Sequence, residues 1–170
     1  DSGHFLLSDE EGDALVSRYP LAAQWVRPLL NGDDFINGQT KQCLWLEGAS
    51  PKELRQCPPV LERVEWVRQF RRGSSREATQ KLAGSPTLFG DVRQPRHTYL
   101  FVPKTSSERR AFVPIGFVEP DVLINNTSLF VDEATPFHFG ILSSTMHNAW
   151  VRTTCGRLKS DYRYSAAIVY

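Results

Sequence analysis

The sequence has no long apolar run, no paired-cysteine pattern and no basic leader, and each absence excludes a class of protein. A membrane-spanning helix needs about 18 consecutive apolar residues, and no stretch approaches that length. The first residues are acidic and polar, so no secretory signal is expected. We therefore predict a cytoplasmic protein with no membrane partner. Because no polar tail follows the last apolar residues, we also expect the chain to be a fragment of a longer protein.

Metal-binding patterns are also missing. The three cysteines, Cys43, Cys57 and Cys155, form no CxxC pair, and their odd number argues against a disulfide framework. We expect all three to be small buried residues in a reducing compartment. His138 and His147 are nine residues apart, which does not match the helical i, i+4 spacing of a metal pair. No metal site is predicted.

Catalytic motifs are missing as well. There is no GxGxxG, no GxxxxGK[ST], no HExxH and no GxSxG. None of the lysines has an acidic residue two positions before it, which argues against a metal-dependent nuclease site. The segment 106–110 places serines beside Glu108, but no histidine is in reach as a base. The chain is therefore predicted to be a binding module and not an enzyme, with no catalytic residue.

The composition fits one globular domain that spans residues 1–170. The chain is 41% hydrophobic and 23% charged, which is ordinary for a soluble domain. Its net charge is only +1, but residues 1–50 carry eight acidic and three basic side chains, a net −5, which leaves +6 for the rest. A basic body favours a nucleic-acid surface. Basic residues gather in residues 68–76, 104–110 and 152–164, although each run could also be a solvated face.

The N-terminal half reads as mainly helical. Ser8 followed by Glu11 predicts a capping box and a helix to about residue 19. Further helices are expected at residues 21–30, from Ser50-Pro51, at 60–71 and at 74–82. Asn37-Gly38 before the apolar run 42–46 predicts a hairpin. The segment 85–97, rich in proline, glycine and arginine, reads as a loop.

The C-terminal half reads as strands followed by a helix. Residues 97–102, 111–117, 122–124 and 129–131 predict an antiparallel sheet of short strands. Thr135-Pro136 begins one long amphipathic helix over about residues 136–155, which Gly156 ends. A strand pair follows, made by the stretch after Gly156 and by residues 166–170. Helices first and strands later predict an α+β fold.

The stretch 156–164 carries the strongest functional signal. In an extended chain every second side chain points the same way, so Lys159, Asp161 and Arg163 should share one face. Three alternating charges make a poor core but a good surface for recognising a polar partner. The alternative is an exposed ion pair between Lys159 and Asp161, which contributes little.

Several segments resemble one known family. They are residues 35–38 with 43–46, Ser106 to Arg110, 113–117, 146–152 and Gly156 to Ser165. They are similar to the target-recognition domain of MmeI-like type IIL restriction-modification enzymes, which are bacterial adenine-specific DNA methyltransferases. The family's catalytic part carries an Asn-Pro-Pro-aromatic motif, whereas the Pro-Pro here lies between Cys57 and Val60. The resemblance thus implies no cofactor in this fragment, S-adenosylmethionine in the parent enzyme, and the parent's catalytic methyltransferase domain and double-stranded DNA as partners.

The resemblance also implies site residues. The family's base-reading positions fall on Lys159, Asp161 and Arg163, with a further contact near Asn126. Lysine and arginine donate to guanine and aspartate accepts from cytosine N4, so Lys159 and Asp161 could read the two halves of one G·C pair. Arg152 is expected to contact the DNA backbone. Phosphate contacts or structural ion pairs are expected at Arg157, Arg109 and Arg110.

The sequence thus predicts sequence-specific DNA recognition in the major groove, on behalf of an N6-adenine methyltransferase that may carry a fused endonuclease. Two alternatives remain open. One is a non-specific or RNA-binding module, and the other is a protein-interaction module of a larger enzyme that uses the aromatic surface around Trp66 and Trp150.

Overall fold

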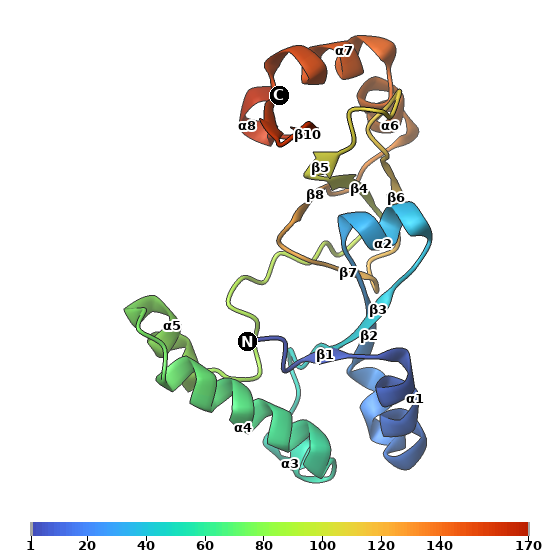
Figure 1. Cartoon of the computed structure of the whole chain (residues 1–170). Helices are drawn as coiled ribbons and strands as arrows, with labels where there is room; N and C mark the ends of the chain where they lie inside the picture. The colour runs from blue at the N-terminus through green and yellow to red at the C-terminus, as the bar shows by residue number, and fades with distance from the viewer. Residues whose placement is uncertain (1, 170) are drawn as a thin grey trace. The chain divides into compact units, whose positions relative to one another are not determined.

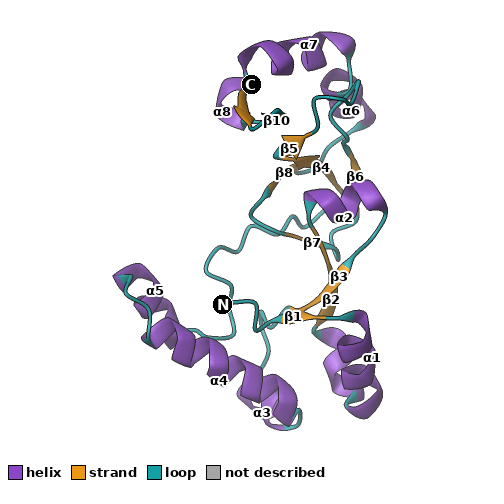
Figure 2. Cartoon of the chain, viewed as in Figure 1, coloured by secondary structure: helices purple, strands orange, loops and turns teal. Residues whose placement is uncertain are grey.

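A computed structural model describes residues 2–169, which fall into two compact units (Figure 1). Unit 1 comprises Asp1–Pro28 and Lys41–Arg93, and unit 2 comprises Leu29–Thr40 and Gln94–Tyr170. Helices and short strands occur in both, so the α+β class is confirmed (Figure 2). None of the helices in the described part of the chain is long and apolar enough to cross a membrane.

Unit 1 begins with the predicted capped helix. Helix α1 (Asp9–Arg18) follows β1 (Leu6–Leu7), and β1 pairs antiparallel with β3 (Lys41–Leu44). The Ser8 hydroxyl accepts a hydrogen bond from the Glu11 amide at 3.1 Å, and the Glu11 carboxylate accepts one from the Ser8 amide at 2.9 Å. These two bonds satisfy amides that the first helical turn leaves without partners. The predicted capping box is confirmed.

The helix predicted over residues 21–30 is wrong beyond its first turn. A 3-10 helix, η1, covers Pro20–Gln24, and the chain then becomes extended as β2 (Val26–Leu30). Pro28 explains the change, because proline lacks an amide proton and clashes with the preceding turn inside a helix, whereas its fixed φ suits an extended strand.

The remaining helices of unit 1 lie close to their predicted positions. They are α3 (Pro51–Arg55), α4 (Pro58–Arg72) and α5 (Glu77–Lys81), and the 3-10 helix η2 (Leu82–Gly84) follows. The helical spacing of Val60, Val64, Val67 and Phe70 predicts one buried stripe on α4. The three valines are buried, whereas Phe70 is 43% exposed. Arg71 is also buried, and its guanidinium donates to three backbone carbonyls, those of Leu82, Ser85 and Leu88. This arginine thus fixes the chain that follows α5.

The three cysteines behave as predicted. Cys43, Cys57 and Cys155 are unpaired and buried. Burial in an apolar environment disfavours the thiolate, and it raises the pKa of Cys43 to about 12. A thiol with that pKa is inert, so a structural role fits.

In unit 2, the hairpin predicted at Asn37-Gly38 is wrong. Residues Gly32–Asn37 form helix α2, whose N-terminus is capped by Asn31. Gly38 ends this helix in the left-handed conformation with φ of 64°. Asn-Gly supplies the positive φ that both a tight hairpin and a helix C-cap require, so the dipeptide alone does not separate the two. Phe35 of α2 then stacks on Phe101, with ring centroids 4.7 Å apart.

The core sheet of unit 2 is built around β4 (Tyr99–Pro103), of which every residue is buried. Strand β4 pairs antiparallel with β6 (Gly116–Val118) and with β8 (Ser128–Val131). The antiparallel sheet is therefore confirmed, but only the end of the predicted strand 111–117 is extended. The strand predicted at 122–124 forms β7 (Leu123–Ile124), which pairs parallel with residues 29–30 of β2.

The predicted helix over residues 136–155 is two helices, α6 (Pro136–Leu142) and α7 (Thr145–Thr154). The break lies at Ser143-Ser144, because the Ser144 hydroxyl accepts a hydrogen bond from the His147 amide and so begins a new helix. The strand expected at residues 166–170 is wrong, since Ala166–Val169 forms helix α8. Residue 170 lies outside the described residues.

Candidate nucleic-acid interface

The stretch after Gly156 forms a β-hairpin, called here the C-terminal hairpin (residues 156–163). Strand β9 (Gly156–Leu158) and strand β10 (Asp161–Arg163) pair antiparallel, and β5 (Thr105–Ser106) pairs with the other edge of β10. Strand β10 is thus the central strand of a three-stranded sheet. Figures 1 and 2 show β5 and β10 at the end of unit 2 that also carries α6, α7 and α8.

Lys159 lies in the turn of this hairpin and not on a strand. Lys159 and Ser160 form the connection between the paired residues Leu158 and Asp161. Lys159 has φ of 57°, the left-handed region that two-residue hairpin turns require. The prediction that Lys159 continues the strand alternation is therefore wrong. It stands at the tip of the hairpin, next to Asp161.

The two strands of the hairpin separate their side chains onto two faces. Arg157 lies opposite Tyr162, so these two side chains share one face, the Tyr162 face. Because neighbours on a strand alternate, Asp161 and Arg163 project from the other face, the Asp161 face, together with Leu158. The predicted common face of Asp161 and Arg163 is confirmed.

Lys159, Asp161 and Arg163 have no side-chain partner within the described part of the chain. Lys159 and Arg163 are exposed and Asp161 is partly exposed. Among residues 2–169 no ion pair or side-chain hydrogen bond involves any of the three. The alternative of an ion pair between Lys159 and Asp161 is therefore wrong for this structure. Their hydrogen-bonding capacity remains available to a ligand.

Arg157, in contrast, is fully engaged on the Tyr162 face. Its guanidinium pairs with the Glu108 carboxylate at 3.1 Å and donates to the Ser160 carbonyl at 2.8 Å. The guanidinium carbon also lies 4.4 Å from the centre of the Tyr162 ring, a cation–π distance. Of the two roles expected for Arg157, the structure contains the ion pair.

Lys104 connects the hairpin to the turn that carries Asn126. The Lys104 carbonyl accepts a hydrogen bond from the Tyr164 amide at 2.8 Å, at the end of β10. The Lys104 amide donates to the Thr127 carbonyl, and its ammonium donates to the Asn126 carbonyl. The exposed Asn126 side chain is thus held near the end of β10 that carries Arg163. Of the four residues expected to read bases, Asn126 therefore lies near Arg163, whereas Lys159 lies at the opposite end of β10.

The loop after β5 carries Arg109 and Arg110, both exposed. Helix α7 holds this loop through Arg152. Arg152 donates to the carbonyls of Arg110 and Ala111. The loop arginines therefore sit on an anchored segment, while the guanidinium of Arg152 is partly used inside the protein.

Two further contacts attach α7 to the site. The buried Asn148 amide oxygen accepts from the Val113 amide at 2.8 Å. Nε2 of His147 lies 2.9 Å from the hydroxyl of Tyr164, the residue that follows β10. Burial lowers the pKa of His147, so its neutral form is favoured. His147 therefore has a structural role, and its hydrogen bond attaches the base of the hairpin to α7.

The residues that support the hairpin were not predicted. Glu108, Lys104 and Asn148 contact the site from positions 22 to 49 residues away along the chain. No spacing rule reaches such distances. The one available signal was the charge of Glu108 within a basic run, which indicates an arginine partner without identifying which one.

The Pro-Pro pair takes part in helix initiation and not in a cofactor site. Pro58 and Pro59 are the first two residues of α4, directly after Cys57, where proline's missing amide proton costs nothing. No amide side chain precedes them and no aromatic residue follows them. These residues therefore do not fit the amine-positioning motif of an adenine methyltransferase. Among residues 2–169 no cluster of three or more metal-binding side chains occurs.

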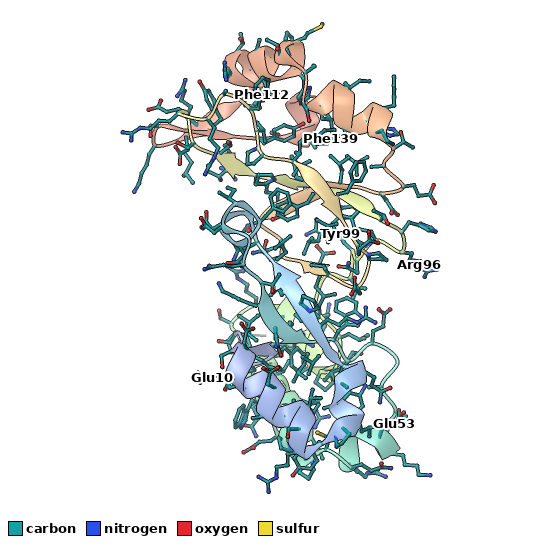
Figure 3. All side chains as sticks on the ribbon, turned by 90° about the vertical axis from the view of Figure 1, so that its right-hand side faces the viewer. Glu10, Glu53, Arg96, Tyr99, Phe112 and Phe139 are labelled. Atoms are coloured by element: carbon teal, nitrogen blue, oxygen red, sulfur yellow. The ribbon has the colours of Figure 1, made fainter. Side chains whose placement is uncertain are left out.

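Helices α6 and α7 expose many large apolar side chains. Met146 is 86% exposed, Phe137 71% and Trp150 53%. Phe112 and Phe139, labelled in Figure 3, are also exposed and lie at the same end of unit 2. Apolar patches of this kind on a soluble protein usually mark an interaction surface.

Comparison with known proteins agrees with these observations. The family model described as the target recognition domain of MmeI matches residues 1–170, and therefore spans both units. DNA methyltransferase A of Bacillus subtilis (strain 168) is 34% identical over 170 residues, 100% of this chain and 19% of that protein. A solved structure of the type IIL restriction-modification enzyme MmeI in complex with DNA is similar with a TM-score of 0.95 and 45% identity, over 100% of this chain and 23% of that one. The chain thus spans about a fifth of each relative, and it belongs to the MmeI target recognition domain family.

Proposed function

We propose that residues 1–170 act as one target-recognition domain that reads a specific sequence in the major groove of double-stranded DNA. The observation that carries this proposal is the C-terminal hairpin, on which Lys159 at the tip and Asp161 and Arg163 on β10 are accessible and unpaired within the described residues. Groups of both signs, held on a short β-hairpin, match the donor and acceptor pattern of base edges. The relative whose structure was solved with DNA supports the choice of ligand.

Each of the four proposed base-reading side chains has a chemical preference. The Lys159 ammonium donates to O6 and N7 of guanine, and the Asp161 carboxylate accepts from N4 of cytosine. Their positions at the tip and at the first residue of β10 allow them to approach the two bases of one G·C pair. Arg163 favours guanine at a neighbouring pair, and the amide of Asn126 favours adenine.

Backbone contacts come from the loop after β5. Arg109 and Arg110 are exposed there, and phosphate contact by arginine positions a protein on DNA without reading sequence. Arg152 joins them through the guanidinium nitrogens that do not bind carbonyls of the loop. Arg157 is assigned a different role below, because Glu108, Ser160 and Tyr162 already surround its guanidinium.

The parent protein is proposed to be a cytoplasmic N6-adenine DNA methyltransferase, with or without a fused endonuclease. Its S-adenosylmethionine site and its Asn-Pro-Pro-aromatic motif lie in a catalytic domain outside these residues. That domain is the proposed partner of the apolar surface on α6 and α7. The exposed side chains of Met146 and Phe137 are apolar, so another protein surface would bury them more favourably than the charged DNA backbone. The domain by itself transfers no methyl group.

A charge exchange tests the reading of one base pair. The variant Lys159→Glu with Asp161→Arg, made in the full-length parent, should change the preferred base at one position from G to C. Sequencing of methylated sites in a randomised DNA library measures the change. An unchanged recognition motif would refute the assignment of these two residues.

The Asp91–Arg93 ion pair provides a matched control. It consists of opposite charges two residues apart at an exposed position in unit 1, with 2.6 Å between Nε of Arg93 and a carboxylate oxygen of Asp91. The exchange Asp91→Arg with Arg93→Asp alters the same kinds of charge and keeps the net charge. The recognition motif should stay the same in this control.

The exposed apolar surface favours a second candidate, a module that binds only protein. Under that candidate the parent loses activity when Met146 and Phe137 become serine, but scrambling the DNA sequence has no effect on affinity. Non-specific nucleic-acid binding likewise predicts equal affinity for target and scrambled DNA. A higher affinity for target DNA than for scrambled DNA at the same salt concentration supports the proposed function instead.

A further inference from the structure

We infer that Glu108, Arg157 and Tyr162 form a brace on the Tyr162 face of the hairpin, and that Glu108 and Arg157 are positioning residues for base recognition. Neither of them contacts DNA under this inference. It rests on the proposed function, because it assigns the orientation of the side chains proposed to read bases. It goes beyond that function by attributing part of the specificity to residues that face away from the ligand.

The geometry of Arg157 is the first argument. Its side chain starts on the edge strand β9, passes over the ring of Tyr162 on the central strand β10, and reaches Glu108 in the loop after β5. The same guanidinium donates to the carbonyl of Ser160 in the turn. One side chain therefore joins the edge strand, the central strand, the turn and the neighbouring loop.

The position of Lys159 explains why such a brace is needed. Lys159 holds a left-handed backbone conformation that L-residues rarely adopt, and such conformations persist where surrounding contacts fix them. The hairpin is short, with three residues in each strand. Hairpins of this size are marginally stable without further contacts. The bond from Arg157 to Ser160 fixes the residue directly after Lys159.

The brace is too exposed to be explained by folding stability. The side chains of Arg157 and Glu108 are 46% and 44% exposed. Ion pairs with this exposure contribute little to the free energy of unfolding. Their orientation effect is different, because recognition of a base edge requires the reading groups to be fixed before binding.

The faces of the hairpin exclude phosphate contact as the main role of Arg157. Asp161 and Arg163 project from one face and Arg157 from the other. When the Asp161 face meets the base edges, the Tyr162 face is directed away from them. Glu108, an anion that would repel phosphate, also accepts a hydrogen bond from Nη1 of this guanidinium.

Three variants of the full-length parent test the inference: Arg157→Gln, Glu108→Ala and the double variant. The methylation rate on the target is compared with the rate on sites that differ by one base pair. Each single variant should lower this ratio about tenfold, the lower end of the discrimination that one bidentate base contact provides. The double variant should lower it no further than the single variants, because residues that act as a unit are not additive.

Arg109→Gln provides the matched control on the neighbouring loop. It should weaken binding to all sequences equally and reduce the slope of log affinity against log salt by about 0.9, the value for one lost phosphate contact. Arg157→Gln should leave that slope unchanged. Urea unfolding of each variant checks that it is folded. If Arg157→Gln is unfolded, the target ratio of Glu108→Ala tests the inference instead, because this variant keeps the contacts of Arg157 with Ser160 and Tyr162.

Two results would overturn the inference. If Arg157→Gln reduces the salt slope as Arg109→Gln does and keeps the target ratio, Arg157 is a phosphate contact. If the ratio is unchanged in both Glu108→Ala and Arg157→Gln, the brace has no role in recognition. Either result leaves the proposed function standing, which fails separately if the exchange at Lys159 and Asp161 leaves the motif unchanged.

Discussion

Asn148 offers the sharpest test of how the loop after β5 is fixed. Its side chain is 3% exposed, and its amide oxygen accepts the Val113 amide proton at 2.8 Å. Its amide nitrogen donates to the Ser144 carbonyl at 2.9 Å. Replacement by leucine keeps the approximate volume but removes these two bonds and a longer one, 3.4 Å, from the same nitrogen to the Leu142 carbonyl. We expect this variant to lose stability and to release the loop.

The expected loss follows from which groups remain without a partner. The Ser144 carbonyl also accepts the backbone amide of residue 148 at 3.1 Å, so it stays satisfied in the variant. The Val113 amide is left without an acceptor in a buried environment, which costs about 1–3 kcal/mol. With a urea dependence of about 1–3 kcal/mol per molar, a loss of about 2 kcal/mol lowers the unfolding midpoint by about 1 M.

Hydrogen exchange at the Val113 amide, together with urea unfolding, measures both effects. Thr153→Val is the control, because Thr153 is an exposed residue of the same helix whose hydroxyl donates to the Ala149 carbonyl at 2.9 Å. Such surface changes usually stay within about 0.5 kcal/mol. If Asn148→Leu unfolds at the same urea concentration as Thr153→Val and the Val113 amide exchanges no faster, the bond does not hold the loop and the reasoning is wrong.

Three further predictions concern other positions. Burial lowers the pKa of His147 below the value of about 6.5 expected in the unfolded chain, so the unfolded chain binds a proton more readily than the folded one. The free energy of unfolding should therefore be constant above about pH 6.5 and decrease as the pH falls below that value. Urea midpoints measured between pH 5 and 7.5 should show this decrease, and His147→Gln should abolish it. Lys159→Gly should stabilise the domain by up to about 1 kcal/mol, because glycine adopts the left-handed conformation without strain, yet sequencing of methylated sites should show lost discrimination at one base pair. Arg71→Lys should destabilise unit 1 by about 2–3 kcal/mol in urea unfolding, since an ammonium does not reproduce a planar fork on three carbonyls, whereas Arg68→Lys, at an exposed pair, should change little.

Local signals in the sequence predicted α1, α3 and α4 of unit 1 well, although not the strand β2 that replaces the helix expected at residues 21–30. The capping boxes at Ser8 and Ser50 lie in the sequence itself, within three residues of their glutamates. Such signals work because the hydrogen bonds that they create are local. The apolar spacing of α4 was readable for the same reason.

Sequence patterns that are compatible with two different local structures led to wrong predictions. Asn37-Gly38 supplies a left-handed residue, which ends a helix as well as it turns a hairpin, and the choice depends on Phe35 packing on Phe101 some 66 residues later. The break between α6 and α7 has no proline and no glycine. It depends on Ser144 capping α7 while Asn148 binds the loop at Val113.

The candidate site was predicted in its residues but not in its geometry. Asp161 and Arg163 share a face because alternation along a strand is a local property. Lys159 was misplaced because its two-residue turn, Lys159-Ser160, contains neither the glycine nor the asparagine that usually indicates such a turn. The brace of Glu108 and Arg157 joins residues 49 positions apart, and only the folded chain brings them together.

The division of the hairpin into two faces bears on how recognition can diverge during evolution. A substitution at Asp161 or Arg163 alters groups that have no internal partner in the described structure, so it removes no contact on which folding depends. The scaffold on the Tyr162 face persists through such changes, because none of its bonds involves those two side chains. Most mutations lower the free energy of unfolding. At Asp161 and Arg163, by contrast, successive substitutions can change the recognised DNA sequence while every intermediate protein remains folded.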